Sequence, residues 1–176
     1  MAVRVKCAVA VVAYATGLPK VSDNPGGTVT MPTRTARTIW TGSLEKGSGQ
    51  VELVSSHVGA YEVSFPRRAA DDAGGVTSPE ELIAAAHSSC YAMQLSNRVA
   101  LAGGTPETLD VRADVALGAD PAGGFRISGI TLTVRGVVPG IDGDAFVKAA
   151  EEAKVGCPVS KALSAVPMTL DASLEG

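Results

Sequence analysis

The chain has 176 residues, of which 45% are hydrophobic and 4% aromatic, and its formal net charge at pH 7 is −3. This length fits one domain with an extension, and the many small apolar residues predict a closely packed globular core. The acidic balance excludes a general nucleic-acid binder, which needs a basic face, and the sequence contains no run of about 20 apolar residues that could span a bilayer. We therefore expect neither nucleic acid nor a membrane as a partner.

Residues 1–30 differ from the rest of the chain. A charged start precedes a short apolar run at 7–18 that contains an Ala-Tyr-Ala triplet, and together these outline a signal peptide. The alternative is an N-terminal extension made from an upstream start, with the working domain at 31–176. We favour the extension, because the thiol chemistry inferred below suits the cytoplasm.

Three short strands are predicted at the start of the working domain. Residues 34–42 and 47–55 predict a hairpin with glycines at its turn, and residues 61–65 alternate as a third strand of a meander. Arg67 and Arg68 end the meander, where a pair of arginines is ordinarily solvated. A loop of small and acidic residues then leads to the next element.

A long helix that carries Cys90 is the next predicted element. Ser78 as N-cap and Glu81 three residues later form a capping box, and a Gly-Gly pair ends the helix after Leu101 or Ala102. The helix is apolar on all sides, so we expect cover from a sheet and from another subunit. On this segment alone, Cys90 is equally consistent with a reactive thiol and with a small buried hydrophobe.

The second half of the chain predicts two long strands, two helices and a final strand, at 109–117, 125–138, 145–155, from Pro158 and at 166–174. Asp142 or Asp144 caps the first of these helices. Cys157 lies at the start of the second, where a helix N-terminus partly stabilises a thiolate. The element order has no alternation of single strands and helices, which predicts an α+β fold with antiparallel sheets.

The three cysteines and two histidines limit the chemistry available. Cys7, Cys90 and Cys157 are too few for a disulfide scaffold and contain no Cys-x-x-Cys pair. His87 and Cys90 lie three apart on one helical face, but two ligands without a third favour ordinary packing over a metal site. We expect no metal and no cofactor.

Three motifs resemble one family of proteins. SPEELIAAAHSSCYAM at 78–93, VPGID at 138–142 and GCPVSKAL at 156–163 are similar to segments of the OsmC/Ohr family of osmotically induced and organic-hydroperoxide-resistance proteins. The resemblance covers about 34–174, and His87 with the PEEL form favours the OsmC branch. It implies an α+β fold with antiparallel sheets around a long central helix that carries Cys90, in an intertwined homodimer.

The resemblance also implies an activity and the residues that perform it. The activity is a thiol-dependent peroxidase that reduces organic hydroperoxides, and less well hydrogen peroxide, in oxidative or osmotic stress defence. Cys90 matches the peroxidatic cysteine, Cys157 the resolving cysteine and Glu80 the catalytic glutamate. Arg68 matches the catalytic arginine, with Arg67 as a rival because the adjacent arginines leave the alignment open by one residue. An external dithiol reductant would reopen the Cys90–Cys157 disulfide.

Helix geometry limits this implied site. Ten residues of straight helix separate Glu80 from Cys90 by about 15 Å along the axis, which an arginine side chain hardly bridges. Either the first turn of the helix bends away, or Glu80 serves the thiol of another subunit. We assign His87, one turn before Cys90, to packing or fine tuning of the site.

Two other functions remain as alternatives. One is a hydroperoxide or electrophile sensor, or a lipid-binding module, in which Cys90 is oxidised without turnover. The other is a cysteine hydrolase, which needs a histidine and a third orienting group beside the thiol. With only His57 and His87 in the chain, the hydrolase is the least supported.

Overall fold

The computed structural model describes residues 32–175, and the chain from Thr35 onward forms one compact unit. The signal-peptide and extension hypotheses for residues 1–30 lie outside the described residues, as does Cys7. Within residues 32–175, no helix is long and apolar enough to cross a membrane.

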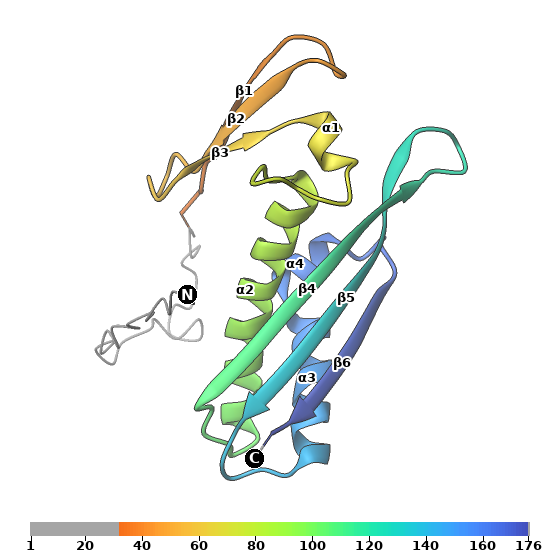
Figure 1. Ribbon diagram of the computed structural model, residues 1–176. Helices are drawn as coiled ribbons and strands as arrows, with labels where there is room; N and C mark the ends of the chain where they lie inside the picture. The colour runs from red at the N-terminus through yellow and green to blue at the C-terminus, as the bar shows by residue number, and fades with distance from the viewer. Residues whose placement is uncertain (1–31, 176) are drawn as a thin grey trace, which may run out of the picture. The chain divides into compact units, whose positions relative to one another are not determined.

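The first sheet is the predicted meander. Strands β1 (Arg37–Thr41), β2 (Ser48–Glu52) and β3 (Ala60–Val63) pair antiparallel in that order (Figure 1). The third strand ends earlier than predicted, because Phe65 begins the short helix α1 (Phe65–Arg68). Pro66 explains the change, since its fixed backbone angle suits a first helical turn and it has no N–H for a strand ladder. The two arginines therefore lie on a helical turn.

Helix α2 (Pro79–Leu101) has the predicted bounds and cap. The Ser78 hydroxyl accepts a hydrogen bond from the Glu81 backbone N–H at 3.1 Å. The second half of the expected capping box differs, because the Glu81 carboxylate accepts from the Thr77 hydroxyl at 2.6 Å. Thr77 also donates its backbone N–H to Glu62 in β3, and this bond ties the start of α2 to the first sheet.

The second sheet contains strands β4 (Thr108–Ala119), β5 (Phe125–Val137) and β6 (Met168–Leu174). β4 and β5 pair antiparallel as expected, but β6 pairs parallel to β5, so the expectation of purely antiparallel sheets is wrong for this strand. The physical reason is the connection between β5 and β6, which runs through α3 (Gly143–Gly156) and α4 (Pro158–Ala162) and returns the chain in the same direction. Asp142, and not Asp144, caps α3 by accepting from the Ala145 N–H at 2.9 Å.

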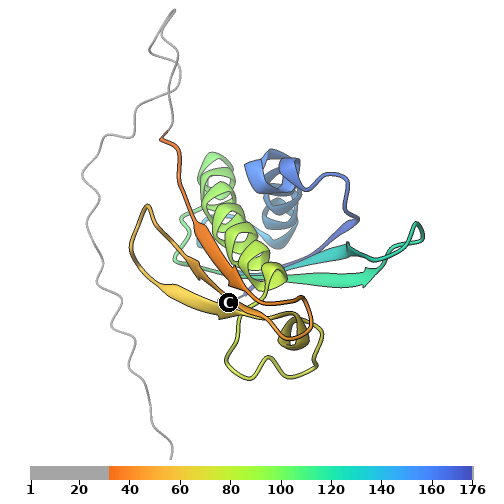
Figure 2. The ribbon, with the colours of Figure 1, turned by 90° about the horizontal axis from the view of Figure 1, so that it is seen from above.

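The helices cover one face of this second sheet. In both views α2 and α3 lie on the same side of β4, β5 and β6, and they also contact each other (Figures 1 and 2). The buried residues of α2 include four at intervals of four: His87, Tyr91, Leu95 and Val99. Together with Leu132 and Phe146 this face forms the core, which confirms the α+β class.

The opposite face of α2 and the first sheet leave large apolar side chains uncovered. Met93 on α2 is 72% exposed, and Ile39 and Trp40 on β1 are 57% and 41% exposed. α2 was expected to be covered on several sides, and within one protomer it is not. Exposed apolar surface of this kind marks an interaction site, so cover by a second subunit stays a prediction.

Candidate active site

Two cysteines from distant parts of the chain meet at the edge of the core. Cys90 lies on α2, and Cys157 lies at the junction of α3 and α4, 67 positions later. Because both α3 and α4 pack against α2, the two Sγ atoms approach to 3.3 Å, and neither is part of a disulfide. Cys157 is completely buried, whereas Cys90 is half-buried. Only Cys90 can therefore meet a substrate directly.

The surroundings of the two thiols shift their pKa values in opposite directions. Burial raises the pKa of Cys90, and the neighbouring Cys157 raises it further. Burial also opposes ionisation of Cys157, but the Ser160 backbone, Cys90 and the Ser160 hydroxyl together lower its pKa. Within one protomer the buried sulfur is therefore the one that favours the thiolate. Among residues 32–175, no cation contributes to the pKa of Cys90, the half-buried sulfur.

Arg68, the cation that the sequence assigned to the site, pairs with Glu80, the carboxylate that was assigned with it. Arg68 donates from Nε to both carboxylate oxygens of Glu80 at 3.1 and 3.0 Å, and from Nη2 to Oε1 at 2.6 Å. The side chains are only 29% and 10% exposed. Burial alone would raise the pKa of Glu80, but the hydrogen bonds and charge of Arg68, together with hydrogen bonds from the Glu80 backbone and from Ser78, lower it. The pair is therefore a charged, bidentate clamp.

Arg67, the rival arginine, has a different environment. Its guanidinium lies against Gly74 in the loop before α2, where an added Cβ would be 2.8 Å from Nη1. Arg68 is thus the arginine of this dipeptide that pairs with Glu80, because a residue on one turn of α1 points away from its neighbour in sequence.

An apolar pocket of about 350 Å³ opens beside Arg68. It lies between the first sheet and the start of α2, and its apolar lining comes from Trp40, Leu44, Val51, Val63, Phe65, Pro79 and Leu82. Arg68 is the only charged residue in that lining. The pocket can therefore hold an apolar group while presenting a guanidinium to a polar end.

The thiol pair and the charged pair do not meet within one protomer. α2 is continuous from Pro79 to Leu101, so Glu80 and Cys90 are separated by about 15 Å of helix rise. No hydrogen bond or ion pair among residues 32–175 joins Arg68 or Glu80 to either cysteine. The alternative of a bent first turn is therefore not what this helix adopts.

Ser160 is a polar residue of the site that sequence analysis missed. It lies on α4, three residues after Cys157, and is 6% exposed. Its hydroxyl is 2.8 Å from His87 Nε2, and His87 is completely buried. Burial lowers the pKa of His87, so the imidazole is neutral. The spacing of Ser160 from Cys157, one helical turn, was the signal in the sequence.

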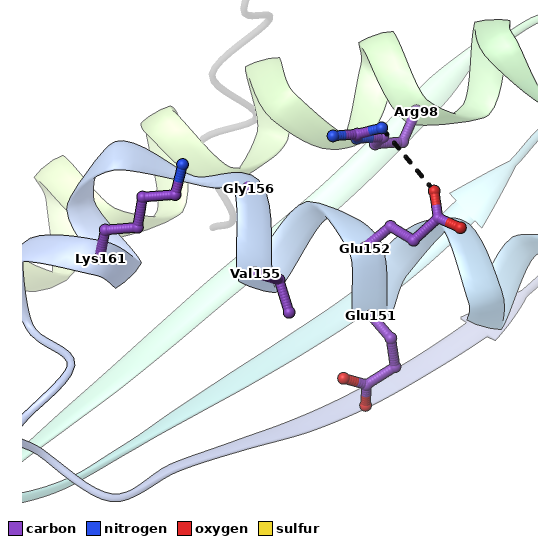
Figure 3. Close-up of a pocket in the computed structure, with 6 residues that line it drawn as sticks. All are labelled: Arg98, Glu151, Glu152, Val155, Gly156 and Lys161. Atoms are coloured by element: carbon purple, nitrogen blue, oxygen red, sulfur yellow. Dashed lines mark ion pairs between the residues drawn. The ribbon is translucent and has the colours of Figure 1, made fainter.

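A second pocket, of about 490 Å³, lies between α2 and the end of α3 and contains no thiol in its lining (Figure 3). Arg98 and Glu152 form a long ion pair across it at 3.8 Å, and Glu151 and Lys161 add further opposite charges. Because its charges balance and neither cysteine lines it, this pocket is separate from the thiol chemistry. Among residues 32–175, no group of three potential ligands is placed to hold a metal.

Comparisons with known proteins find relatives of this chain. Residues 71–171 match the family model described as OsmC-like protein. The chain is 41% identical over 136 residues to the peroxiredoxin OsmC of Escherichia coli (strain K12), and the same holds for that of Shigella flexneri. Each match covers 77% of this chain and 92% of the relative.

Solved structures of similar fold match most of the chain. An organic hydroperoxide resistance protein from Elizabethkingia anophelis is 26% identical with a TM-score of 0.64, and the match covers 84% of this chain and 100% of that one. An organic hydroperoxide resistance protein OsmC from Legionella pneumophila is 23% identical with a TM-score of 0.63, covering 82% and 98%. The latter likeness shows the fold alone.

Proposed function

The chain belongs to the OsmC-like protein family, and on that premise we propose that it is a cysteine-based peroxidase that reduces organic hydroperoxides. The observation that carries the proposal is the thiol pair. One sulfur is accessible enough to meet a peroxide, and a buried second sulfur lies 3.3 Å away to resolve the product. The names of the relatives, a peroxiredoxin and organic hydroperoxide resistance proteins, support the same chemistry.

The proposed reaction uses the two cysteines in sequence. The Cys90 thiolate attacks the distal peroxide oxygen, an S–O bond forms, the O–O bond breaks, and the alkoxide takes a proton and leaves as an alcohol. Cys90 is now a sulfenic acid. The Cys157 thiolate attacks this sulfur, an S–S bond forms between Cys157 and Cys90, and the S–O bond breaks with release of hydroxide. An external dithiol reduces that disulfide to two thiols and is itself oxidised.

Activation of Cys90 requires a second copy of the chain in this proposal. Within one protomer the pKa of Cys90 is raised, first by burial, and Arg68 with Glu80 lies about 15 Å along the helix. A thiolate needs a nearby cation. The exposed apolar residues of β1 and α2 offer a surface for an intertwined homodimer. Such a dimer would bring Arg68 of one protomer, held by Glu80, to Cys90 of the other.

The apolar pocket beside Arg68 supports an organic substrate. Its volume of about 350 Å³ suits an alkyl or aryl group. The guanidinium at its edge would then hold the peroxide end of the same molecule near the thiolate. Hydrogen peroxide lacks the apolar group, so we propose that it is the poorer substrate. Because a dithiol must recycle the enzyme, we also propose that it works in the reducing cytoplasm, in defence against oxidative or osmotic stress.

Peroxide consumption by cysteine variants tests the activity. With an organic hydroperoxide and a dithiol reductant, the wild type should consume many equivalents of peroxide per chain, and Cys90→Ser should consume none above background. Cys157→Ser should make about one equivalent of sulfenic acid and then slow, because the resolving thiol is missing. Full activity of Cys90→Ser contradicts the proposal. A wild type that stops after about one equivalent is a sensor.

Mixed dimers test whether the site is shared between protomers. Equal amounts of Arg68→Met and Cys90→Ser chains are unfolded and refolded together. Random pairing then makes about half of all dimers heterodimers. A shared site leaves one intact Cys90 facing one intact Arg68 in each heterodimer, so about 25% of wild-type activity should return. A site within one protomer should regain none.

The matched control mixes wild type with the double variant Arg68→Met/Cys90→Ser. A shared site predicts about 25% of the activity of the same total amount of wild type, since only wild-type homodimers are active. A site within one protomer predicts about 50%, because every wild-type chain is active. The two mixtures thus move in opposite directions under the two hypotheses.

A further inference from the structure

A small polar cluster is buried next to Cys157 and has no part in the reaction described above. Its members are His87 from α2 and Ser160 from α4, which come together only because these two helices pack against each other. The imidazole is completely buried and Ser160 is nearly so. Burial of polar groups costs free energy unless they hydrogen bond, so the burial of these two polar side chains calls for a physical account.

The position of the proton on His87 follows from its partners. Nε2 is 2.8 Å from the Ser160 hydroxyl, whereas Nδ1 is buried and has no partner among the described residues. A proton on Nδ1 would leave a buried N–H donor unpaired, which native structures avoid. The proton therefore belongs on Nε2, and His87 donates to Ser160. Because the Ser160 oxygen is then an acceptor toward His87, its own O–H remains free to donate.

In the proposal below, this O–H donates to the sulfur of Cys157, which lies three residues earlier in the chain and is completely buried. Ser160 follows Cys157 by three residues on the turn that α4 begins, and the backbone carbonyl of Cys157 accepts from the Lys161 N–H at 3.0 Å, which fixes this turn. The hydroxyl and backbone of Ser160 both act to lower the pKa of Cys157, against the opposing effect of burial. The polar cluster thus favours negative charge on the buried sulfur.

We propose that His87 and Ser160 are positioning residues that hold Cys157 as the leaving sulfur, so that the external reductant attacks Cys90 and expels the Cys157 thiolate. The proposal rests on the peroxidase function, since it concerns the recycling half of that reaction. Two observations fix the direction of attack. Cys157 is completely buried and out of reach of an external thiol, while Cys90 is half-buried. A sulfur that carries negative charge easily also leaves faster.

One thiolate of the dithiol attacks Cys90 Sγ, a mixed disulfide bond forms, and the Cys90–Cys157 bond breaks with its electron pair going to Cys157. The hydroxyl of Ser160 donates a hydrogen bond to the Cys157 thiolate that this step creates. The second thiolate of the reductant then attacks its own mixed disulfide, releases the Cys90 thiolate and closes the reductant's disulfide. Two electrons pass from the dithiol to the protein. The two protons of the dithiol go to the Cys90 and Cys157 thiolates or to water.

Trapping the mixed disulfide on the wild-type protein tests the direction of attack. The protein is oxidised to its disulfide with diamide, which avoids any need for peroxidase turnover. It is then treated briefly with glutathione, quenched with acid and unfolded, so that an alkylating agent reaches the buried thiol, and the peptides are identified by mass spectrometry. We expect at least tenfold more glutathione on Cys90, with the alkyl group on Cys157. Equal labelling, or an excess of glutathione on Cys157, overturns the proposal.

Titration of the buried thiol tests the two positioning residues. In a Cys90→Ser background, the thiolate of Cys157 is followed by its ultraviolet absorbance. Ser160→Ala should lower the thiolate population at neutral pH about tenfold, and Ser160→Thr, which keeps the hydroxyl, should restore most of it. His87→Leu should act in the same direction but less, because Ser160 keeps its proton and loses only the contact that orients it.

Ser164→Ala is the matched control for this titration. It removes the same hydroxyl one turn later, from an exposed residue, and should leave the titration of Cys157 unchanged. If Ser160→Ala titrates like this control, Ser160 does not act on Cys157 and the proposal is wrong. If Ser160→Ala does not fold, the Thr variant and the trapping experiment on wild type still decide it. Loss of peroxidase activity with the trapping result intact would contradict only the peroxidase function.

Discussion

Helix α2 carries one member of each of two residue pairs, Glu80 of the charged pair and Cys90 of the thiol pair. Each pair lacks what the other has. Cys90 and Cys157 form a thiol pair, 3.3 Å apart, in which the accessible sulfur has a raised pKa because of burial. Arg68 and Glu80 form a charged pair with three hydrogen bonds, and neither residue bonds to a thiol among residues 32–175. One pair has the nucleophile without a cation, and the other has the cation without a nucleophile.

The difference between the pairs shows what a single protomer can do alone. The thiol pair can form its disulfide within the protomer, because both sulfurs come from the same core. Activation of Cys90 is different, because the rigid spacing of one helix keeps Glu80 about 15 Å away. In the proposed mechanism, resolution by Cys157 therefore depends only on the folded chain, whereas activation by Arg68 depends on the proposed assembly.

The largest expected effect comes from removing the cation of the charged pair. Arg68→Met should lower kcat/KM for an organic hydroperoxide by about 100-fold, because the Cys90 thiolate loses its charge partner. Arg67→Met is the matched control, since its guanidinium lies against Gly74 and outside the pair, and it should stay near wild type. Steady-state kinetics of both variants measures this. Equal losses in the two variants would remove the distinction between the arginines.

Replacing the carboxylate of the same pair should have a smaller effect that depends on pH. Because Arg68 lowers the pKa of Glu80 in the folded state, the pair adds stability that is fully present above the ordinary carboxyl value of 4.5 and is lost as the pH falls through the lowered pKa. Glu80→Gln should lower kcat/KM by about tenfold through a less well held Arg68.

Denaturant unfolding at several pH values measures the stability part of that prediction. The difference in free energy of unfolding between wild type and Glu80→Gln should be largest near neutral pH and should shrink as the pH falls from the ordinary carboxyl value of 4.5 through the lowered pKa of Glu80. A difference that stays constant over this range would mean that the ionised Glu80 contributes no stability through Arg68.

The smallest expected effect comes from the helix cap beside the charged pair. Ser78→Ala removes the acceptor for the Glu81 N–H and should destabilise the protein by about 1 kcal/mol. Because the loss falls on the first turn of α2, amide hydrogen exchange should speed up near Glu80 more than near Cys90. Chemical denaturation and exchange mass spectrometry check the two parts. Uniform loss of protection along α2 would mean that the two ends are not independent.

The sequence predicted best what local chemistry decides. The cap of α2, its end after Leu101 and the hairpin between β4 and β5 follow from capping residues and glycines close in sequence. The parallel pairing of β6 could not be predicted in this way, because its partner is chosen by the packing of α3 and α4 against the sheet. Non-local packing decides such pairings.

The candidate site divides along the same line. The resemblance pointed to Arg68 and Glu80, but the choice over Arg67 depends on which side chain the α1 turn directs toward α2. Ser160 and His87 are 73 positions apart, so no local sequence pattern predicts their contact. The separation of the two pairs was predictable, because it needs only the rise of a helix.

The close approach of Cys90 and Cys157 has a thermodynamic consequence for the reaction cycle. A bond between them closes a loop of 67 positions in the unfolded chain, and the loss of chain entropy in that state favours the folded protein by about 4 kcal/mol. In each turnover the protein would then pass between a disulfide form and a less stable dithiol form. Under peroxide excess, the protein would accumulate in the disulfide form, which resists heat and proteolysis best. The supply of reductant would then set the lifetime of the protein as well as the rate of turnover.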